Sequence, residues 1–462
     1  MNKHKRLRQS ATRRVIYITV AAMMTACGGG YGGGSSMPPA TATISVMPTT
    51  IKLGQSATLT WSTNGTMCTA SGAWSGSKAA SGTETVTPTA VGTDTYTLVC
   101  SGGAYGGSSS QSATLMVTAM AGAMSSSAFS MAKLVSDGSV TAATTDMHLV
   151  NPRGIAFAPN APVWVANNGT QTSKSYEGTG TKVARVVAIP AGLNGSANPT
   201  GIVFNRTADF VVTQNNVSAP ASFILDGEGG TIAAWAGTVN AANALIMYDD
   251  GAGGAVYTGL AIAQNASANF LYAADFHNNK IDVFDKSFIK VTTAGGFADS
   301  SLPAGYAAFG IQAIQIHTRT MIYVTYAKQA SGARNSVDGT GLGLVNVFDT
   351  DGILQKHLIA VGGALNAPWG ITLAPASFGT LSNDLLIGNS GDGVINGYDP
   401  TSGAFIGSVN DANGQPISTP GLWGIAFGNG ANNQPTTALY FAAGIAQGAD
   451  GLYGRISLEG SN

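Results

Sequence analysis

One short motif occurs six times in the C-terminal part of this 462-residue chain, and this repeat restricts its fold more than any other feature does. In each copy a glycine is followed directly by an apolar run that is typical of a β-strand. The glycines are Gly154, Gly201, Gly259, Gly310, Gly370 and Gly424, and neighbouring copies are 47 to 60 residues apart. A repeat of roughly this length, built from short strands, is typical of the blades of a β-propeller. Six copies therefore predict six blades.

A second apolar run follows the first in every repeat, and a third is plain in several. The second runs begin at Val163, Phe210, Leu271, Ile322, Leu385 and Leu439. The third runs are clearest at 280–285, 343–349 and 393–399. Glycine occupies 62 positions and charged residues make up only 10% of the chain, which suits many short strands joined by tight turns.

The two ends of the repeat region suggest how the ring closes. After Gly424 the chain has room for only three strands, so the last blade lacks its outermost strand. Residues 129–135, just before the first repeat, have the apolar character of such a strand. Pairing between the first and last strands would remove an exposed sheet edge. We therefore expect a closed propeller over residues 129–460.

The region ahead of the propeller predicts a small β-sandwich at residues 42–118. Apolar and small polar residues alternate at 44–46, 57–61, 85–87, 95–100 and 113–117, with turn residues between them. The order Trp61, Cys68, Cys100 resembles bacterial Ig-like modules of cell-surface proteins. The tryptophan precedes both cysteines, however, so a bridge between the two sheets is not assumed. Such modules mostly act as spacers, and residues 119–128 are predicted to be a linker.

The N-terminus has the features of an export signal. Six Lys and Arg residues precede a short apolar run at 15–24, and small residues lead to Cys27. Residues 1–26 resemble a bacterial lipoprotein signal peptide, in which Cys27 would be lipidated. The Gly/Ser-rich segment 27–41 is predicted to be a flexible tether. We therefore expect a lipid-anchored protein of the cell envelope, on the outer membrane or cell surface; an uncleaved anchor or ordinary secretion is the alternative.

The cysteines and the charges constrain the environment and the partners. If Cys27 carries lipid, Cys68 and Cys100 remain as one pair, and an oxidising envelope permits a disulfide; two buried free thiols are the alternative. Without the six N-terminal basic residues, the chain has 16 Lys and Arg residues and 23 Asp and Glu residues, so its net charge is negative. A nucleic-acid-binding protein has a basic face, so no nucleic-acid partner is expected.

Several long motifs of the repeat region resemble one known family. They are Leu-Val-Asn-Pro-Arg-Gly at 149–154, the run 273–285, Leu-Asn-Ala-Pro-Trp-Gly-Ile at 365–371, Gly-Asn-Ser-Gly-Asp-Gly at 388–393 and the run 421–430. Residues 129–460 resemble an uncharacterised family of exported bacterial NHL-like propeller proteins, grouped with PEP-CTERM-associated conserved hypothetical proteins. The resemblance implies the fold and no established activity. Two departures are the missing C-terminal sorting segment and Arg153, which stands where a tryptophan such as Trp369 is expected.

Polar residues gather in loops that open on one face of a propeller. These are the loops between the second and third strands and the loops leading into the first strand, which include Asn151 and Arg153. The predicted ligand-face residues are Asn168, Asn215, Asp275, His277, Asn278, Asn389, Asp392, Trp369 and Trp423. Amides, a few carboxylates and aromatic rings around a central well predict a ligand platform.

A metal site on the same face is the alternative interpretation. Oxygen atoms of Glu228, Asp275, Asn168, Asn215 and Asn389 are of the type that Ca²⁺ or another divalent cation prefers. A bound cation would polarise an ester carbonyl, as in a metal-dependent lactonase or esterase. This hypothesis depends on analogy between folds, and Asn and Asp in turns commonly bond to their own backbone.

The sequence therefore favours a non-catalytic binding module that takes a protein, a glycan or a small molecule. Metal-assisted hydrolysis is the second hypothesis. A purely structural or adhesive role is the third, and it would need no polar well.

Overall fold

The computed structural model describes residues 40–52, 55–88, 92–102, 107–118, 127–193, 195–265, 268–316 and 318–460. The chain divides into two compact units, Met1–Gly122 and Ala123–Asn462. The predicted signal peptide, Cys27, nearly all of the tether and most of the linker lie outside the described residues. Within the described ranges, no helix has the length and apolarity needed to cross a membrane.

The smaller unit consists of two β-sheets around one apolar core. One sheet contains β1 (Ala42–Met47), β3 (Ala57–Thr63) and β6 (Ser81–Val86). The other contains β2 (Thr50–Lys52), β8 (Ser108–Thr118), β7 (Gly92–Ser101), β4 (Met67–Gly72) and β5 (Gly76–Lys78). Alternating residues of the central strands, such as Leu59, Leu98 and Leu115, are fully buried. This is the predicted sandwich.

A disulfide joins Cys68 and Cys100 in the core of the smaller unit. Cys68 on β4 lies directly opposite Cys100 on β7, so the bridge links neighbouring strands of one sheet. Trp61 packs edge-to-face on Trp74, with ring centroids 5.3 Å apart. The predicted disulfide is confirmed.

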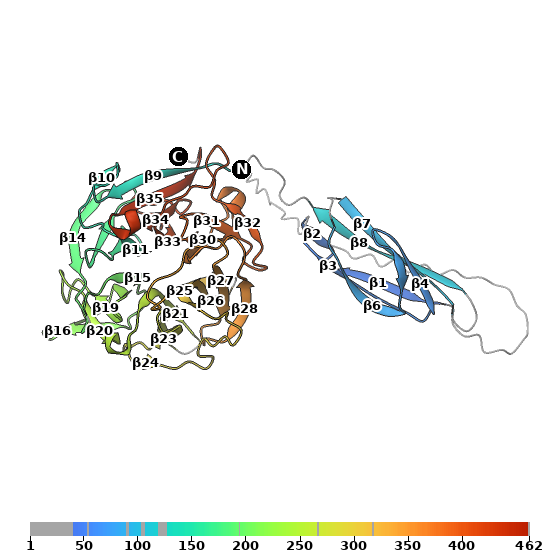
Figure 1. The fold of residues 1–462 in the computed structure, drawn as a ribbon, viewed down its shortest axis with the longest axis horizontal. Coiled ribbons are helices and arrows are strands. Elements are labelled where there is room, and N and C mark those ends of the chain that lie inside the picture. Colours follow the sequence, from blue (N-terminus) through green and yellow to red (C-terminus); the bar gives the residue numbers. More distant parts are fainter. Residues whose placement is uncertain are drawn as a thin grey trace, which may run out of the picture. The chain divides into compact units, whose positions relative to one another are not determined.

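In the larger unit the strands form six antiparallel blades, which Figure 1 shows as a ring. The first blade contains β11 (Pro152–Ala156), β12 (Val163–Asn167), β13 (Thr172–Tyr176) and β14 (Lys182–Ala188). The second contains β15 (Pro199–Phe204), β18 (Phe223–Gly227), β19 (Thr231–Trp235) and β20 (Leu245–Asp249). The third contains β21 (Tyr257–Gln264), β22 (Asn269–Asp275), β23 (Lys280–Phe284) and β24 (Lys290–Val291). The next two are β25 (Tyr306–Ile316), β26 (Arg319–Lys328), β27 (Gly343–Phe348) and β28 (Leu354–Ile359); and β29 (Pro368–Leu373), β30 (Leu385–Asn389), β31 (Ile395–Tyr398) and β32 (Phe405–Ser408).

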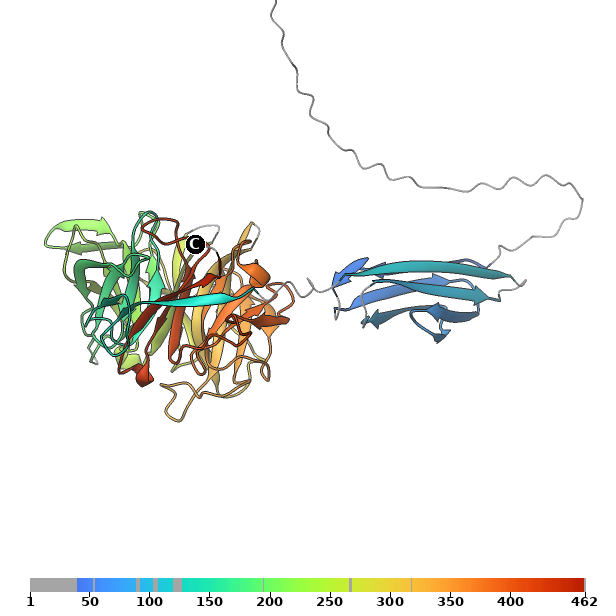
Figure 2. The same cartoon turned by 90° about the horizontal axis from the view of Figure 1, so that it is seen from above.

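The last blade combines both ends of the larger unit. Its strands are β33 (Leu422–Phe427), β34 (Leu439–Ala443), β35 (Leu452–Leu458) and β9 (Phe129–Ser136), with the two-residue β10 (Thr144–Thr145) beside β9. Strand β9 pairs antiparallel with β35 along its length; Figure 1 shows the two strands side by side, and Figure 2 shows β9 (teal) at the outer side of the ring. The predicted closure by residues 129–135 is confirmed.

The six repeat glycines lie on the innermost strands, where neighbouring blades come closest. Each innermost strand contacts the next one, and β33 returns to β11. A Cβ on Gly310 would lie 2.1 Å from the carbonyl oxygen of Trp369, and one on Gly424 would lie 2.5 Å from that of Arg153. The repeat requires glycine because the backbone of the next blade occupies the space of a side chain.

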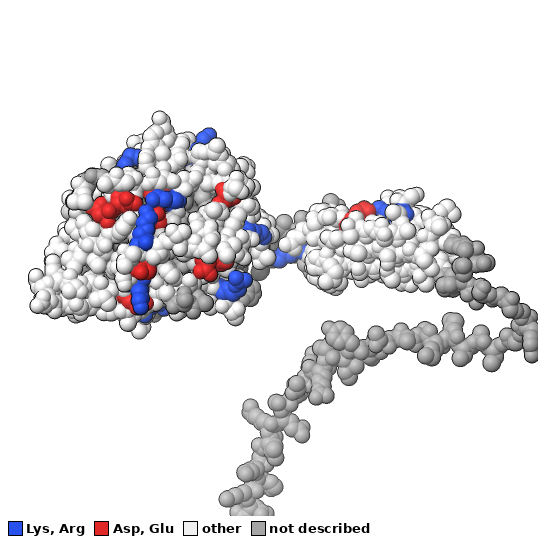
Figure 3. Space-filling model, turned by 90° about the horizontal axis from the view of Figure 1, so that it is seen from below, with Lys and Arg blue, Asp and Glu red and all other residues white. Residues whose placement is uncertain are grey.

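The second blade differs from the predicted one. The run beginning at Phe210, predicted as its second strand, forms a separate hairpin of β16 (Val211–Gln214) and β17 (Val217–Pro220). The hairpin turn is Asn215-Asn216, and both residues have positive φ, as a tight two-residue turn requires. The true second strand is β18, so the hairpin is an insertion in this blade. On the side of the larger unit that Figure 3 shows, most of the surface is uncharged, and Lys and Arg side chains lie in clusters together with Asp and Glu side chains.

Candidate binding site

A cavity of about 400 Å³ opens at one mouth of the ring; we call it the cup. The loops leading into the first strands and the loops between second and third strands form its wall, as expected for one face of a propeller. The polar side chains at its surface are Asn151, Arg153, Glu228, Thr258, Arg334, Asn335, Ser336, Asp338, Ser390 and Gln447. Phe309, Pro420 and Trp423 contribute apolar surface.

The floor of the cup is built from the residue that precedes each repeat glycine. Every innermost strand has a register irregularity at this point, for example between Pro152 and Ile155 on β11. Such a bulge redirects a side chain. The six residues are Arg153, Thr200, Thr258, Phe309, Trp369 and Trp423, of which four line the cup.

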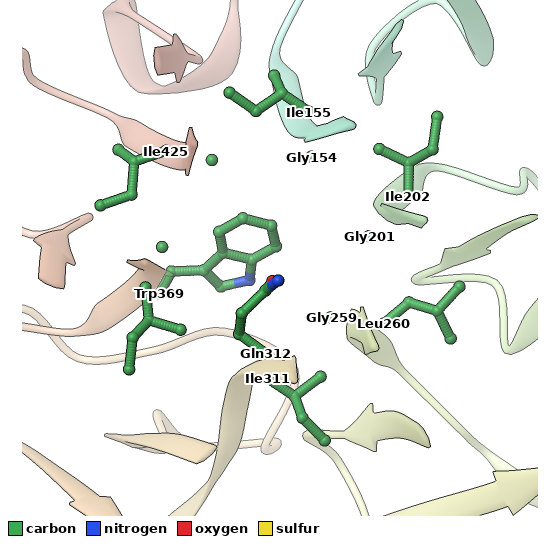
Figure 4. A pocket seen from close by; sticks show the side chains of 13 residues that line it. Gly154, Ile155, Gly201, Ile202, Gly259, Leu260, Ile311, Gln312, Trp369 and Ile425 are labelled. Atoms are coloured by element: carbon green, nitrogen blue, oxygen red, sulfur yellow. The ribbon is translucent and has the colours of Figure 1, made fainter. Parts of the chain in front are cut away.

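Trp369 lies beneath the cup, across the middle of the ring (Figure 4). Its indole Nε1 donates a hydrogen bond of 2.7 Å to the carbonyl oxygen of Thr258, on a different blade. Trp369 also packs edge-to-face on Trp423, with centroids 5.9 Å apart. Below it, a narrow space of about 40 Å³ is surrounded by the six branched residues that follow the repeat glycines. The tryptophan therefore separates the cup from the rest of the channel.

A fixed ion pair lies on the floor. Nη2 of Arg153 is 3.1 Å from Oε1 of Glu228, and the two side chains are 11% and 24% exposed. The guanidinium carbon of Arg153 lies 3.9 Å from the ring centroid of Trp423, in cation–π contact. The amide of Asn168 donates to Oε2 of Glu228 over 3.4 Å. The carboxylate is thus held with one side open to the cup.

The long loop 329–342, between β26 and β27, forms one wall of the cup. At its start Nε2 of Gln329 donates to the carbonyl oxygen of Phe276 at 2.5 Å. In the middle, Nδ1 of His277 lies 3.2 Å from the carbonyl oxygen of Ala333, and near the end Gly339 N–H donates to Oδ1 of Asn366. Neighbouring blades therefore hold this loop on both sides.

A buried carboxyl group lies next to the innermost strand of the second blade. Oδ1 of Asp226 accepts hydrogen bonds from Thr200 Oγ1 at 2.8 Å and from Gly201 N–H at 2.6 Å. Its Oδ2 has no hydrogen-bond partner among the described residues. Burial, with a smaller contribution from the negative charge of Glu228, raises the pKa of Asp226 to about 7.

The structure places the predicted ligand-face residues in several different positions. Trp423 lines the cup, and Trp369 closes its base. Asn168 lies behind the wall, where it accepts from Asn151 and donates to Glu228. His277 holds the long loop. Asn215 is exposed at the tip of the inserted hairpin and is not among the residues that line the cup.

The remaining four predicted residues bond to one another and to the loop that leads into the first strand of the same blade. Asp275 is fully buried and accepts from Val256 N–H and from the side-chain amide of Asn278, at 3.1 and 2.8 Å. Asn389 accepts from Asn366 N–H at 3.1 Å and donates to Asp392 at 3.4 Å. None of these four lines the cup as described. The strands present them to backbone N–H groups because each ends at a tight turn.

The residues proposed for a metal do not form one cluster. Glu228 and Asn168 are in contact, but Asp275 pairs with Lys280 at 3.4 Å, and Asn389 and Asn215 belong to other turns. In the part of the chain that the structure describes, no group of three His, Cys, Asp or Glu residues is arranged to hold a metal ion.

Sequence reasoning did not find several residues of the cup. Thr258 and Phe309 could have been found, because both immediately precede a repeat glycine. Arg334, Asn335, Ser336 and Asp338 carry no such signal, since a long loop has no fixed position in the repeat.

The closed ring of antiparallel sheets and its polar mouth define a β-propeller protein with a cup at one end of its axis. The uncharacterized protein R648 of Acanthamoeba polyphaga mimivirus is 31% identical over 329 residues, which are 70% of this chain and 78% of that protein. The uncharacterized protein L690 of the same virus is 31% identical over 330 residues, 70% of this chain and 84% of that protein. This chain belongs to the same family as these two mimivirus proteins.

Similar solved structures are more distant. A Bacteroides thetaiotaomicron protein of unknown function has a TM-score of 0.44 and 12% identity, covering 91% of this chain and 98% of that chain. Streptogramin B lyase has a TM-score of 0.43 and 10% identity, covering 72% and 98%. Likeness at this level says nothing about activity. No family model matches the chain, so the resemblance to exported bacterial propeller proteins stays a prediction.

Proposed function

We propose that the larger unit is a non-catalytic binding module whose ligand occupies the cup. The observation that carries this proposal is a cavity of about 400 Å³ that combines hydrogen-bonding side chains with the rings of Trp423 and Phe309. Ligand sites commonly have this size and combine apolar surface with a few fixed polar groups. The ion pair of Arg153 and Glu228 is already formed without a ligand, and such preorganisation lowers the entropic cost of binding.

A cup-filling variant tests this proposal. Ser336→Trp places a large ring in the cup, whereas Ser287→Trp places the same ring on an exposed turn between β23 and β24. We expect small molecules that raise the melting temperature of the full chain to lose their effect in Ser336→Trp only. Small molecules that still raise the melting temperature of both variants as they do for wild type would contradict the proposal.

The hydrolase hypothesis has its own test. The full chain, with and without added Ca²⁺, is assayed on lactone and ester panels, and its metal content is measured after dialysis. We expect no turnover. If the full chain hydrolyses a substrate and Ser336→Trp abolishes this activity, the proposed binding function is wrong and the cup is an active site.

The smaller unit is proposed to be an Ig-like spacer, and the chain is proposed to be displayed on the cell envelope. The basic and apolar N-terminal segments and Cys27 support export and lipid anchoring. In a bacterial host, we expect the protein in the membrane fraction and the Cys27→Ser variant in the soluble fraction. Membrane association that survives this substitution would contradict lipid anchoring.

A further inference from the structure

The chemistry of the cup narrows the class of ligand it can take. We propose that the cup binds a neutral saccharide of one or two rings; this inference rests on the proposed binding function. Its support comes from three properties of the lining: the balance of charge, the supply of free hydrogen-bonding groups and the half-buried ring of Trp423.

The charges in the cup cancel. Arg153 and Arg334 stand against Glu228 and Asp338, and the inner pair is already joined at 3.1 Å. A site for an anion would have an excess of Arg or Lys, and a site for a cation would have an excess of carboxylates. The cup has neither, so its charged groups suit a ligand without net charge.

The free polar groups suit hydroxyls. Among the described residues, the side chains of Asn335, Ser336, Asp338 and Gln447 line the cup without a hydrogen-bond partner. Amides, a hydroxyl and a carboxylate include both donors and acceptors, and each hydroxyl of a sugar can be either. An apolar ligand would leave these groups unsatisfied, which costs about 1–3 kcal/mol for each buried group.

The aromatic floor suits the C–H faces of a sugar ring. Trp423 is half-buried, carries the guanidinium of Arg153 on its ring and lies 5.8 Å, centroid to centroid, from the buried Phe309. The part of Trp423 that remains open supplies apolar surface below a polar wall, and a saccharide has the same two-sided character. A cavity of about 400 Å³ is in the range that holds a small molecule.

The test is saturation-transfer NMR of the full chain with glucose, galactose, mannose, N-acetylglucosamine, maltose, cellobiose and lactose, followed by calorimetry. We expect at least one sugar to bind and its deoxy analogues to bind more weakly, because a site built for hydroxyls rejects ligands that lack them. Gln447→Ala and Arg334→Ala are each expected to weaken binding about 3- to 10-fold, the effect of one hydrogen bond.

The matched control is Gln355→Ala, on the outermost strand of the fourth blade, which should leave the affinity unchanged. Acetate, phosphate, a zwitterionic dipeptide and an acidic peptide are tested alongside the sugars. Suppose that one of these four probes binds, that Ser336→Trp abolishes its binding, and that no sugar binds. The saccharide proposal is then overturned, while the binding function stands. If no probe or library compound responds to Ser336→Trp, the binding function itself is overturned.

Discussion

In each repeat, the glycine of the innermost strand and the residue before it have different structural roles. The glycine lets the next blade approach, and the preceding side chain forms the mouth of the ring. At Gly310 an added Cβ would meet the carbonyl oxygen of Trp369 at 2.1 Å and Thr325 Oγ1 at 2.7 Å. The backbone contact cannot be relieved by a rotamer change, so the two blades would have to separate.

We therefore expect Gly310→Ala to lower the free energy of unfolding by about 1–3 kcal/mol or more, the usual cost of overpacking. Gly407→Ala is the control, because an added Cβ there meets nothing within 4 Å and its φ is not positive. Urea unfolding of both variants checks the prediction. Equal midpoints would contradict the close-approach argument.

The carboxyl of Asp226 makes stability depend on pH. Its pKa in the folded protein is about 7, above the ordinary value of 3.8. Between about pH 4 and pH 7 the folded protein therefore holds a proton that the unfolded chain has lost. The stability from this group is complete below about pH 4 and is lost as the pH rises to about 7.

We expect Asp226→Asn to remove this decline, because the amide is neutral at every pH and keeps an oxygen for Gly201 N–H. One pKa unit corresponds to about 1.4 kcal/mol, so wild type should lose roughly 2–4 kcal/mol relative to the variant between pH 4 and pH 7. Denaturant unfolding across this range measures the difference. The exposed Glu459→Gln serves as control, and parallel pH profiles for wild type and Asp226→Asn would refute the assignment.

At the scale of elements, β9 and the inserted hairpin have contrasting roles. Strand β9 completes the last blade, and Phe129 packs against Phe378 with centroids 4.7 Å apart. The hairpin β16–β17 pairs only with itself. The chain already closes at its base, where Ala221 N–H donates to the carbonyl oxygen of Phe210.

Deletion of residues 129–136 is expected to open the ring and lower the melting temperature of the larger unit sharply. The comparison is a variant in which Asn-Gly replaces residues 213–218, which keeps the buried Val212 and its partner Ala219 and should melt close to wild type because no blade loses a strand. Calorimetry distinguishes the two. A β9 deletion that melts like wild type would contradict closure by this strand.

The repeat made most of this element pattern predictable. A glycine, an apolar run and a turn recur because each blade meets the same neighbour in the same way, so five of six second strands and the closing strand follow from the pattern. The prediction for the run beginning at Phe210 was wrong because apolar and polar residues alternate in it and it ends in Asn-Asn, as in a blade strand. The pairing of β15 with β18, from Pro199 opposite Gly227 to Phe204 opposite Phe223, shows that β18 is the second strand of this blade.

The site was less predictable than the fold. Asp275 and Asn389 have the residue types of ligands, but the turn geometry at the end of a strand directs them to backbone N–H groups. Arg153 and Trp423 could be placed at the mouth because they flank repeat glycines. The wall formed by residues 334–338 depends on contacts between blades, which the local pattern does not encode.

At the scale of the whole molecule, the two units stabilise themselves by different means. The larger one closes on itself by strand pairing, whereas the smaller one has the Cys68–Cys100 disulfide. The sequence has no cysteine after Cys100. Reducing conditions should therefore act on one unit and leave the other unaffected.

We expect Cys68→Ser/Cys100→Ser to destabilise the smaller unit by about 3–4 kcal/mol, the value for a bridged loop of this length. The calorimetric transition of the larger unit should not move. Cys27→Ser, which leaves the bridge intact, is the control. A shift of both transitions by the same amount would show that the units do not unfold separately.

The pairing of β9 with β35 also sets an order of events in time. As the chain is made or exported from its N-terminus, β9 emerges among the first elements of the larger unit, and its partner emerges last. Until then the growing arc has an unpaired strand at each end, and unpaired strand edges attract other chains. The larger unit is therefore most exposed to misassembly just before β35 emerges, and a chain truncated before β35 leaves the arc permanently open.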